Sequence, residues 1–312
     1  MQLIIFTKKF TSIVFVFVLS LVFFDYYTGG DQEVYRAVYE NLSDMDLFDA
    51  FIYYRTKTNS EELVHFFLSW LVGSYVDQNI FVAISNSVLA YAALSLFQKW
   101  GASFYVALII ILTNYYLLVL YFPAERLKFG FILLSFSLIN INSKKFYIFF
   151  VLAVVAHVQI IILYASIFAT YLTKIFQGRI HSRLIFFLPL FIGIPLYLMS
   201  DQISRKFFDY SGGEMEGHQL GLVGTWKLIV FFLLSIYYSK DKVETISFFA
   251  PLFFAVFLIG GERINQFGYF LFLYYGLRFK GGRNYGVAVT SAYYAYASLV
   301  FIAKIIQHGH GF

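Results

Sequence analysis

The chain has 312 residues, of which 60% are hydrophobic and only 13% are charged. Soluble domains usually carry about a quarter charged residues, so the composition excludes a disordered chain and an ordinary cytosolic enzyme and predicts a polytopic membrane protein. The sequence contains no cysteine, which excludes disulfides, thiol catalysis and Cys-ligated metals. The net charge of +5 comes from basic residues scattered between apolar runs, which is typical of membrane orientation signals and not of nucleic-acid binding.

Apolar runs near membrane-spanning length recur along the whole chain. They cover 10–27, 79–97, 103–122, 127–141, 146–172, 184–200, 220–238, 243–260, 264–279 and 285–303. The first run lacks a small-residue cleavage site and many others follow it, so we expect an uncleaved first helix. Backbone groups in lipid must be satisfied within each helix, so the expected fold is all-α, one membrane domain over residues 1–312.

Three segments depart from this pattern. Residues 28–62 and 201–219 are long and polar, and residues 63–76 are apolar but too short for a clear span. We interpret 28–78 as an outer-face loop that carries a short interfacial or re-entrant helix. Glycines in 201–219 predict a mobile outer-face loop acting as a lid, with Arg205 as a substrate-binding candidate, although a plain flexible connector fits equally well.

The distribution of Lys and Arg predicts the orientation of the spans. The basic loops fall inside if the N-terminus is inside, 63–76 does not cross, and 146–172 forms two short spans that meet near His157. This topology has about 11 crossings. If 146–172 is one tilted helix, everything after it inverts and several basic loops lie outside. If 63–76 crosses, only the first 62 residues change sides, so this alternative stays open.

Two Glu-Arg pairs fall on the same outer face in this topology. Glu125-Arg126 precedes the run at 127, and Glu262-Arg263 precedes the run at 264. A guanidinium matches phosphate geometry, and helix N-termini add N–H donors, so two such pairs would form an anion site. The alternative is that each arginine reaches the membrane interface or pairs with its own glutamate.

His157 lies in the middle of an apolar run, AVVAHVQII. An ionisable group at that depth indicates function, although a neutral histidine bonded to a neighbouring helix is the alternative. No residues have metal-ligand spacing, so we expect neither a metal nor another cofactor.

The segment 29–39, GGDQEVYRAVY, begins the first polar stretch. Asp31, Tyr35 and Tyr39 recur at a spacing of four and would share one face of a short helix. Carboxylates and tyrosines suit sugar hydroxyls through hydrogen bonds and stacking, whereas a solvated amphipathic helix is the alternative. Further along, Glu61-Glu62 would supply acids to the N-terminus of the 63–76 helix.

Taken in order, these motifs resemble a known family. The pattern GxDxxxYxxxY comes first, and an acidic residue before a short apolar run follows it. The later segments are, in chain order, PAERLKFGFILLSFSL, NSKKFYIFF, AVVAHVQIIILY and GGERINQFGYF. Together they are similar to the EpsG-type branch of the Wzy polysaccharide polymerases, over about residues 25–280. The family motif more often has Arg-Gln where this chain has Arg126-Leu127-Lys128.

The resemblance implies a fold like that of the multi-helix GT-C glycosyltransferases and a place in the bacterial inner membrane. The implied substrate is an oligosaccharide on undecaprenyl pyrophosphate, with membrane lipid, a flippase and a chain-length regulator as further partners. Transfer from this donor needs a stabilised leaving group and an aligned acceptor hydroxyl. The catalytic candidates are Arg126, Arg263, His157, Glu125 and Asp31. Substrate-binding candidates are Tyr35, Tyr39, Glu262, Lys128 and Arg205.

Three other functions fit some of these features. A flippase of the same lipid-linked sugar would also use paired arginines, but should show an internal repeat, which we do not find. An O-antigen ligase would perform the same chemistry with a different acceptor. A structural subunit would use both Glu-Arg pairs only to hold helices together. The size of the product distinguishes these functions.

Overall fold

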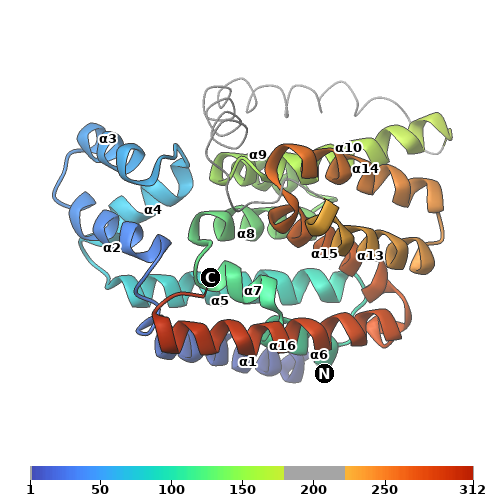
Figure 1. The fold of residues 1–312 in the computed structure, drawn as a ribbon, viewed down its shortest axis with the longest axis horizontal. Helices are drawn as coiled ribbons and strands as arrows, with labels where there is room; N and C mark the ends of the chain where they lie inside the picture. The colour runs from blue at the N-terminus through green and yellow to red at the C-terminus, as the bar shows by residue number, and fades with distance from the viewer. Residues whose placement is uncertain (1, 179–221, 312) are drawn as a thin grey trace. The chain divides into compact units, whose positions relative to one another are not determined.

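A computed structural model describes residues 2–178 and 222–311, and this part of the chain is helical without strands (Figure 1). The helices of its first half are α1 (Gln2–Phe24), α2 (Asp31–Leu42), α3 (Leu47–Thr58), α4 (Leu63–Gly73), α5 (Gln78–Lys99), α6 (Phe104–Thr113), α7 (Tyr115–Tyr121), α8 (Glu125–Ile139) and α9 (Lys145–Ala156). The remaining ones are α10 (Ile160–Phe176), α13 (Leu222–Tyr238), α14 (Lys242–Ile259), α15 (Gly261–Arg278), the short 3-10 helix η2 (Lys280–Gly282) and α16 (Tyr285–His308). The all-α prediction is therefore confirmed for the described residues.

The chain divides into two compact units. The first contains residues 1–157 and 288–312, and the second contains residues 158–287. The division falls at the break between α9 and α10, where His157 has an extended backbone, with φ −159° and ψ 120°. Two helices therefore meet near His157, as the sequence indicated for the run 146–172.

In the first unit, α5 packs against both α1 and α8, and α8 packs against α9. Helices α2, α3 and α4 lie together beside them (Figure 1). Their shared core contains Val38, Leu42, Ala50, Tyr54 and Phe66, all almost completely buried. The polar stretch 28–62 thus folds as two helices on the short apolar helix α4. Helix α2 is amphipathic and buries one apolar face, whereas α3 buries Ala50 and Tyr54 and leaves Phe48 exposed.

A bend and a terminal segment complete this unit. Helices α6 and α7 meet at 60°, where Asn114 ends α6 and caps α7 by accepting hydrogen bonds from two backbone N–H groups. Helix α16 packs on α7, with the hydroxyl of Tyr294 donating to that of Tyr116 at 3.1 Å. Beyond α16, the carbonyl of Gly309 accepts from the backbone N–H groups of Thr28 and Gly29, at 2.9 Å each.

In the second unit, α10 packs on α14 and α13 packs on α15. Lys174 and Glu244 form an ion pair of 3.0 Å between α10 and α14. Helices α13 and α15 approach closely at two glycines, since a Cβ on Gly261 would lie 2.8 Å from the backbone of Gly224. Gly261 therefore serves a close helix contact, whereas Gly260 has open space around it and a positive φ of 88°.

Two described helices are long and apolar enough to cross a membrane, Gln78–Lys99 and Lys280–His308, and the bent pair α6–α7 would be a third. Shorter apolar helices occupy three of the other expected runs, 10–27, 146–172 and 220–238, and the run 184–200 lies outside the described residues. Large apolar side chains stay exposed on α16, including Val289, Tyr296 and Leu299, each about two-thirds exposed. Such surfaces indicate membrane association.

Candidate functional site

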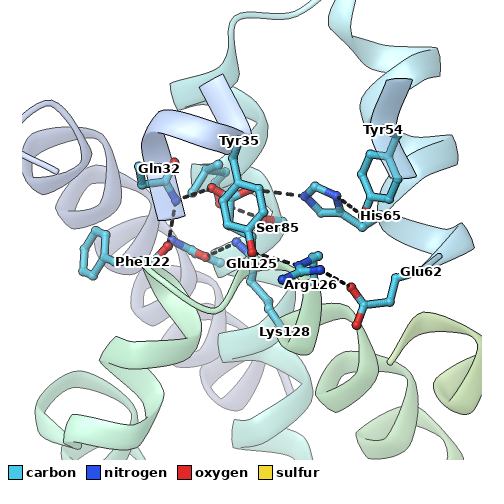
Figure 2. A network of polar contacts seen from close by, with 12 residues as sticks. Gln32, Tyr35, Tyr54, Glu62, His65, Ser85, Phe122, Glu125, Arg126 and Lys128 are labelled. Carbon is cyan, nitrogen blue, oxygen red and sulfur yellow. Dashed lines mark hydrogen bonds and ion pairs between the residues drawn. The ribbon is translucent and has the colours of Figure 1, made fainter. Parts of the chain in front are cut away.

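A network of polar side chains in the first unit lies where α8 begins, against α2, α3 and α4 (Figure 2). Glu125 and Arg126 are the first two residues of α8. They do not pair with each other. Instead their side chains reach different partners, so one short sequence motif supplies two adjacent polar clusters.

Arg126 is the centre of the first cluster. Its Nε donates to the hydroxyl of Tyr35 at 2.9 Å, and its Nη1 lies 3.0 Å from Glu62 Oε2. Nη1 also lies 3.4 Å from the carbonyl of Thr58. The arginine side chain is 21% exposed, whereas that of Glu62 is fully buried. Tyr35 of α2 and Glu62 before α4 therefore hold Arg126 on one side (Figure 2), and its side chain stays partly accessible.

His157 joins this cluster through the same carboxylate. Its Nε2 lies 3.2 Å from Glu62 Oε1, and the residue is only 7% exposed. The extended backbone at His157 ends α9 and lets the side chain turn toward α4. The structure thus brings together two sequence-predicted site residues, Arg126 and His157, because the Glu62 carboxylate contacts both.

Glu125 forms the second cluster. Its Oε1 accepts from Gln32 Nε2 at 2.6 Å, and its Oε2 lies 3.5 Å from His65 Nε2. The other nitrogen of His65 lies 3.1 Å from the hydroxyl of Tyr54. The carboxylate is almost completely buried, so these partners replace its water.

Burial and partners shift the pKa values of these groups in opposite directions. Burial alone would raise the pKa of Glu125, but the hydrogen bond from His65, the Lys128 charge and the Gln32 hydrogen bond together lower it. The pKa of Tyr35 is raised, mainly by burial and partly by nearby carboxylates, although the Arg126 charge opposes this. Glu125 is therefore anionic and Tyr35 neutral at pH 7.

Arg126 remains a cation despite its burial. Burial lowers the pKa of Arg126, but the Glu62 carboxylate and the Tyr35 hydroxyl more than offset this, so the net pKa is raised. A fixed positive charge with partial access to the surroundings is suited to binding an anion.

The other predicted residues of this unit have different surroundings. Lys128 is fully buried and donates to Asn86 Oδ1 at 2.8 Å, which is an internal contact between α8 and α5. Tyr39 donates to the carbonyl of Val76 at 2.9 Å, beyond α4. Asp31 is exposed at the start of α2. Of the three residues at a spacing of four, Tyr35 is the one that contacts Arg126.

The second Glu-Arg pair belongs to the second unit. Glu262 and Arg263 lie in the first turn of α15, and both are exposed. Arg205 and the whole segment 201–219 lie outside the described residues. The clusters around Arg126 and Glu125 are consequently the parts of the predicted site that the structure describes in detail.

Sequence reasoning missed several members of these clusters. His65 lies in the apolar run LVHFFLSWLV, so the argument that singled out His157 would have found it. Glu62 was expected to serve the N-terminus of the 63–76 helix. The structure places it at the N-cap of α4 but without a side-chain capping bond, because its carboxylate turns to Arg126 and His157. Gln32 and Tyr54 carry no distinguishing sequence signal.

Within residues 2–178 and 222–311, no three His, Asp or Glu side chains are grouped as metal ligands would be. No family model, curated protein or solved structure matches the chain. The case for function therefore depends on the chemistry of the clusters themselves.

Proposed function

We propose that this protein polymerises undecaprenyl-pyrophosphate-linked oligosaccharide repeat units into a surface polysaccharide, on the outer face of the bacterial cytoplasmic membrane. The observation that carries the proposal is Arg126, a cation anchored by Tyr35 and Glu62 yet still 21% exposed. Among the described residues, the hydrogen bonds and the ion pair of Arg126 are made by Nε and Nη1, which leaves Nη2 for a phosphate oxygen.

The reaction is a glycosyl transfer in which arginine takes the role that a metal ion has in other transferases. The oxygen of the acceptor hydroxyl attacks the anomeric carbon of the donor sugar. The bond from that carbon to the pyrophosphate oxygen breaks, and the electron pair leaves with the pyrophosphate, whose charge the guanidinium of Arg126 stabilises. The proton of the acceptor hydroxyl passes to a base.

His157 is the best placed of the three sequence-predicted bases. Its Nε2 lies 3.2 Å from Oε1 of Glu62, the residue whose carboxylate also pairs with Arg126. Glu125 has both oxygens engaged by Gln32 and His65, and Asp31 is exposed at the start of α2, where its charge helps to raise the pKa of Tyr35. Arg263, in the second unit, is a further candidate for binding pyrophosphate, as the resemblance to the EpsG-type polymerases implies.

The proposal includes a topology of about 11 crossings with a GT-C-like arrangement, and a flippase and a chain-length regulator as partners. The long apolar helices α5 and α16 and the exposed apolar surface of α16 support a membrane location. The helix break at His157 supports the reading of 146–172 as two short spans.

The decisive experiment supplies the purified full chain, in lipid nanodiscs, with synthetic undecaprenyl-pyrophosphate repeat units, and sizes the products. We expect a ladder of polymer that Arg126→Lys reduces about 30- to 1000-fold, since lysine keeps the charge but loses the planar fork. Arg55→Lys is the matched control, because Arg55 forms an exposed pair with Glu61 at 2.8 Å in the same unit. One single transfer would indicate a ligase, and no product would overturn the proposal.

A further inference from the structure

Glu62 is the one carboxylate that contacts both Arg126 and His157 among the described residues. Its Oε2 lies 3.0 Å from Arg126 Nη1, and its Oε1 lies 3.2 Å from His157 Nε2. We infer that Glu62 is a positioning residue that fixes the anion-binding arginine and the proton-accepting histidine on opposite oxygens of one carboxylate. This inference rests on the proposed function.

The three residues come from separate parts of the first unit. Glu62 precedes α4, Arg126 lies in the first turn of α8, and His157 follows α9. Helix α4 packs against both α8 and α9. No short stretch of backbone joins these positions, so the distance between the guanidinium and the imidazole depends on the carboxylate between them.

The surroundings of Glu62 favour a positioning role over a direct part in proton transfer. Its side chain is completely buried, and each oxygen faces a different basic side chain. A base must reach the hydroxyl whose proton it accepts, and a carboxylate with no exposed surface does not reach a sugar. It also makes no capping bond to α4, so supporting the helix N-terminus does not explain its burial.

A buried carboxylate is costly unless it is paired. Glu62 is paired twice, and both partners are groups that the transfer needs. A carboxylate on one ring nitrogen orients an imidazole and favours proton uptake by it, as partners of metal-bound and catalytic histidines do. The same carboxylate, together with Tyr35 on Nε, restricts the guanidinium to one orientation. The Glu62 side chain thus sets the distance between the leaving-group site at Arg126 and the base His157.

The test compares Glu62→Gln and Glu62→Asp with Glu61→Gln. The neighbouring Glu61 pairs with exposed Arg55, so its variant controls for loss of a carboxylate in the same connection. Polymer formation from synthetic undecaprenyl-pyrophosphate repeat units gives donor KM and kcat, and detergent melting gives stability. Glu62→Gln should raise the donor KM and lower kcat, with a combined loss of about 10- to 100-fold. Glu61→Gln should resemble the wild-type chain.

Two double-mutant cycles separate positioning from general stability. If Glu62 acts through its partners, Glu62→Gln should cost much less activity in an Arg126→Lys or a His157→Gln background than in the wild-type chain. Glu62→Asp keeps the charge but is one methylene too short to hold both partners. The Glu62→Asp variant should fold and lose as much polymerising activity as Glu62→Gln. If Glu62→Gln does not fold, the activity of Glu62→Asp tests the positioning role.

The outcomes distinguish the two proposals. Absence of any product from the wild-type chain would overturn the proposed function and this inference with it. An active wild-type chain with fully active Glu62→Asp and Glu62→Gln would overturn the inference alone. The inference would also be overturned if the activity losses of the single variants simply added in both double-mutant cycles. A loss of activity that only parallels a fall in melting temperature would overturn it as well.

Discussion

Arg126 forms its ion pair with Glu62, 64 positions earlier in the numbering, and not with its neighbour Glu125; the Nη1–Oε2 distance is 3.0 Å. The neighbouring carboxylate instead accepts a hydrogen bond from Gln32. The pairing of arginine with its own glutamate, which the sequence left open, does not occur at this position. A tertiary ion pair of this kind makes Arg126 dependent on the α3–α4 connection.

The first prediction concerns the stability of that pair. Glu62→Leu should destabilise the protein by about 3 kcal/mol, because it leaves Arg126 unpaired, at the low end for buried pairs since the arginine is partly exposed. Adding Arg126→Met should recover most of this loss. Thermal melting in detergent measures both. The control combines Glu125→Leu with Arg126→Met, and here Arg126→Met should not restore the stability lost in Glu125→Leu. Restored stability in this control would contradict the structure.

The second prediction concerns acid stability. The pKa of Glu125 is lower in the folded protein than its usual value of 4.5. Its ionised form therefore stabilises the fold above about pH 4.5, and this contribution is lost as the pH falls through the lowered pKa. Glu125→Gln should remove that part of the pH dependence. Melting temperatures between pH 7 and pH 3 should fall less steeply for the variant, and parallel curves would count against a specific role of Glu125.

The third prediction concerns topology, and it uses the absence of native cysteine. Single cysteines at Ser143 and Arg283 should react with an impermeant thiol reagent only from the cytoplasmic side. Cysteines at Asp44 and Glu262 should react from outside. All four positions are exposed, so access is limited by the membrane. Labelling of positions 262 and 283 from the same side would exclude a single crossing by the intervening helix.

The fourth prediction concerns the contact of α13 with α15. Gly261→Ala should destabilise the protein by about 1–3 kcal/mol, because its Cβ would lie 2.8 Å from the backbone of Gly224. Gly29→Ala is the matched control, since the nearest atoms there are 3.6 Å away, an ordinary contact. Melting temperatures compare the two. Equal values would mean that the helices separate without cost.

The sequence predicts the helices of this protein better than the contacts between them. Apolar runs place α5, α8 and α15 within a few residues, and a histidine inside a run marks the break at His157. Periodicity is a local signal, and these features are local. The chain also singles out Arg126, His157 and Tyr35 one by one, because charged and aromatic groups in such surroundings need an explanation.

The link between these residues has no local signal. Glu62 follows Glu61 in the chain, yet Glu61 forms a partly exposed pair with Arg55 and Glu62 is completely buried. Their different roles arise from the packing of α4 on α8 and α9, which depends on segments far apart in sequence. Gln32 is similar, since nothing around it in the sequence indicates that it bonds to Glu125.

The contact between Gly309 and the turn before α2 has a consequence for biosynthesis. One carbonyl near the end of the sequence holds the N–H groups of both Thr28 and Gly29, and α2 supplies Gln32 and Tyr35 to the two clusters. Chains emerge from the ribosome beginning with the N-terminus. The anchor of α2 is therefore translated about 280 residues after the turn that it holds. A nascent chain that stalls before Gly309 therefore carries every residue of the Arg126 cluster but lacks the carbonyl that holds the turn before α2.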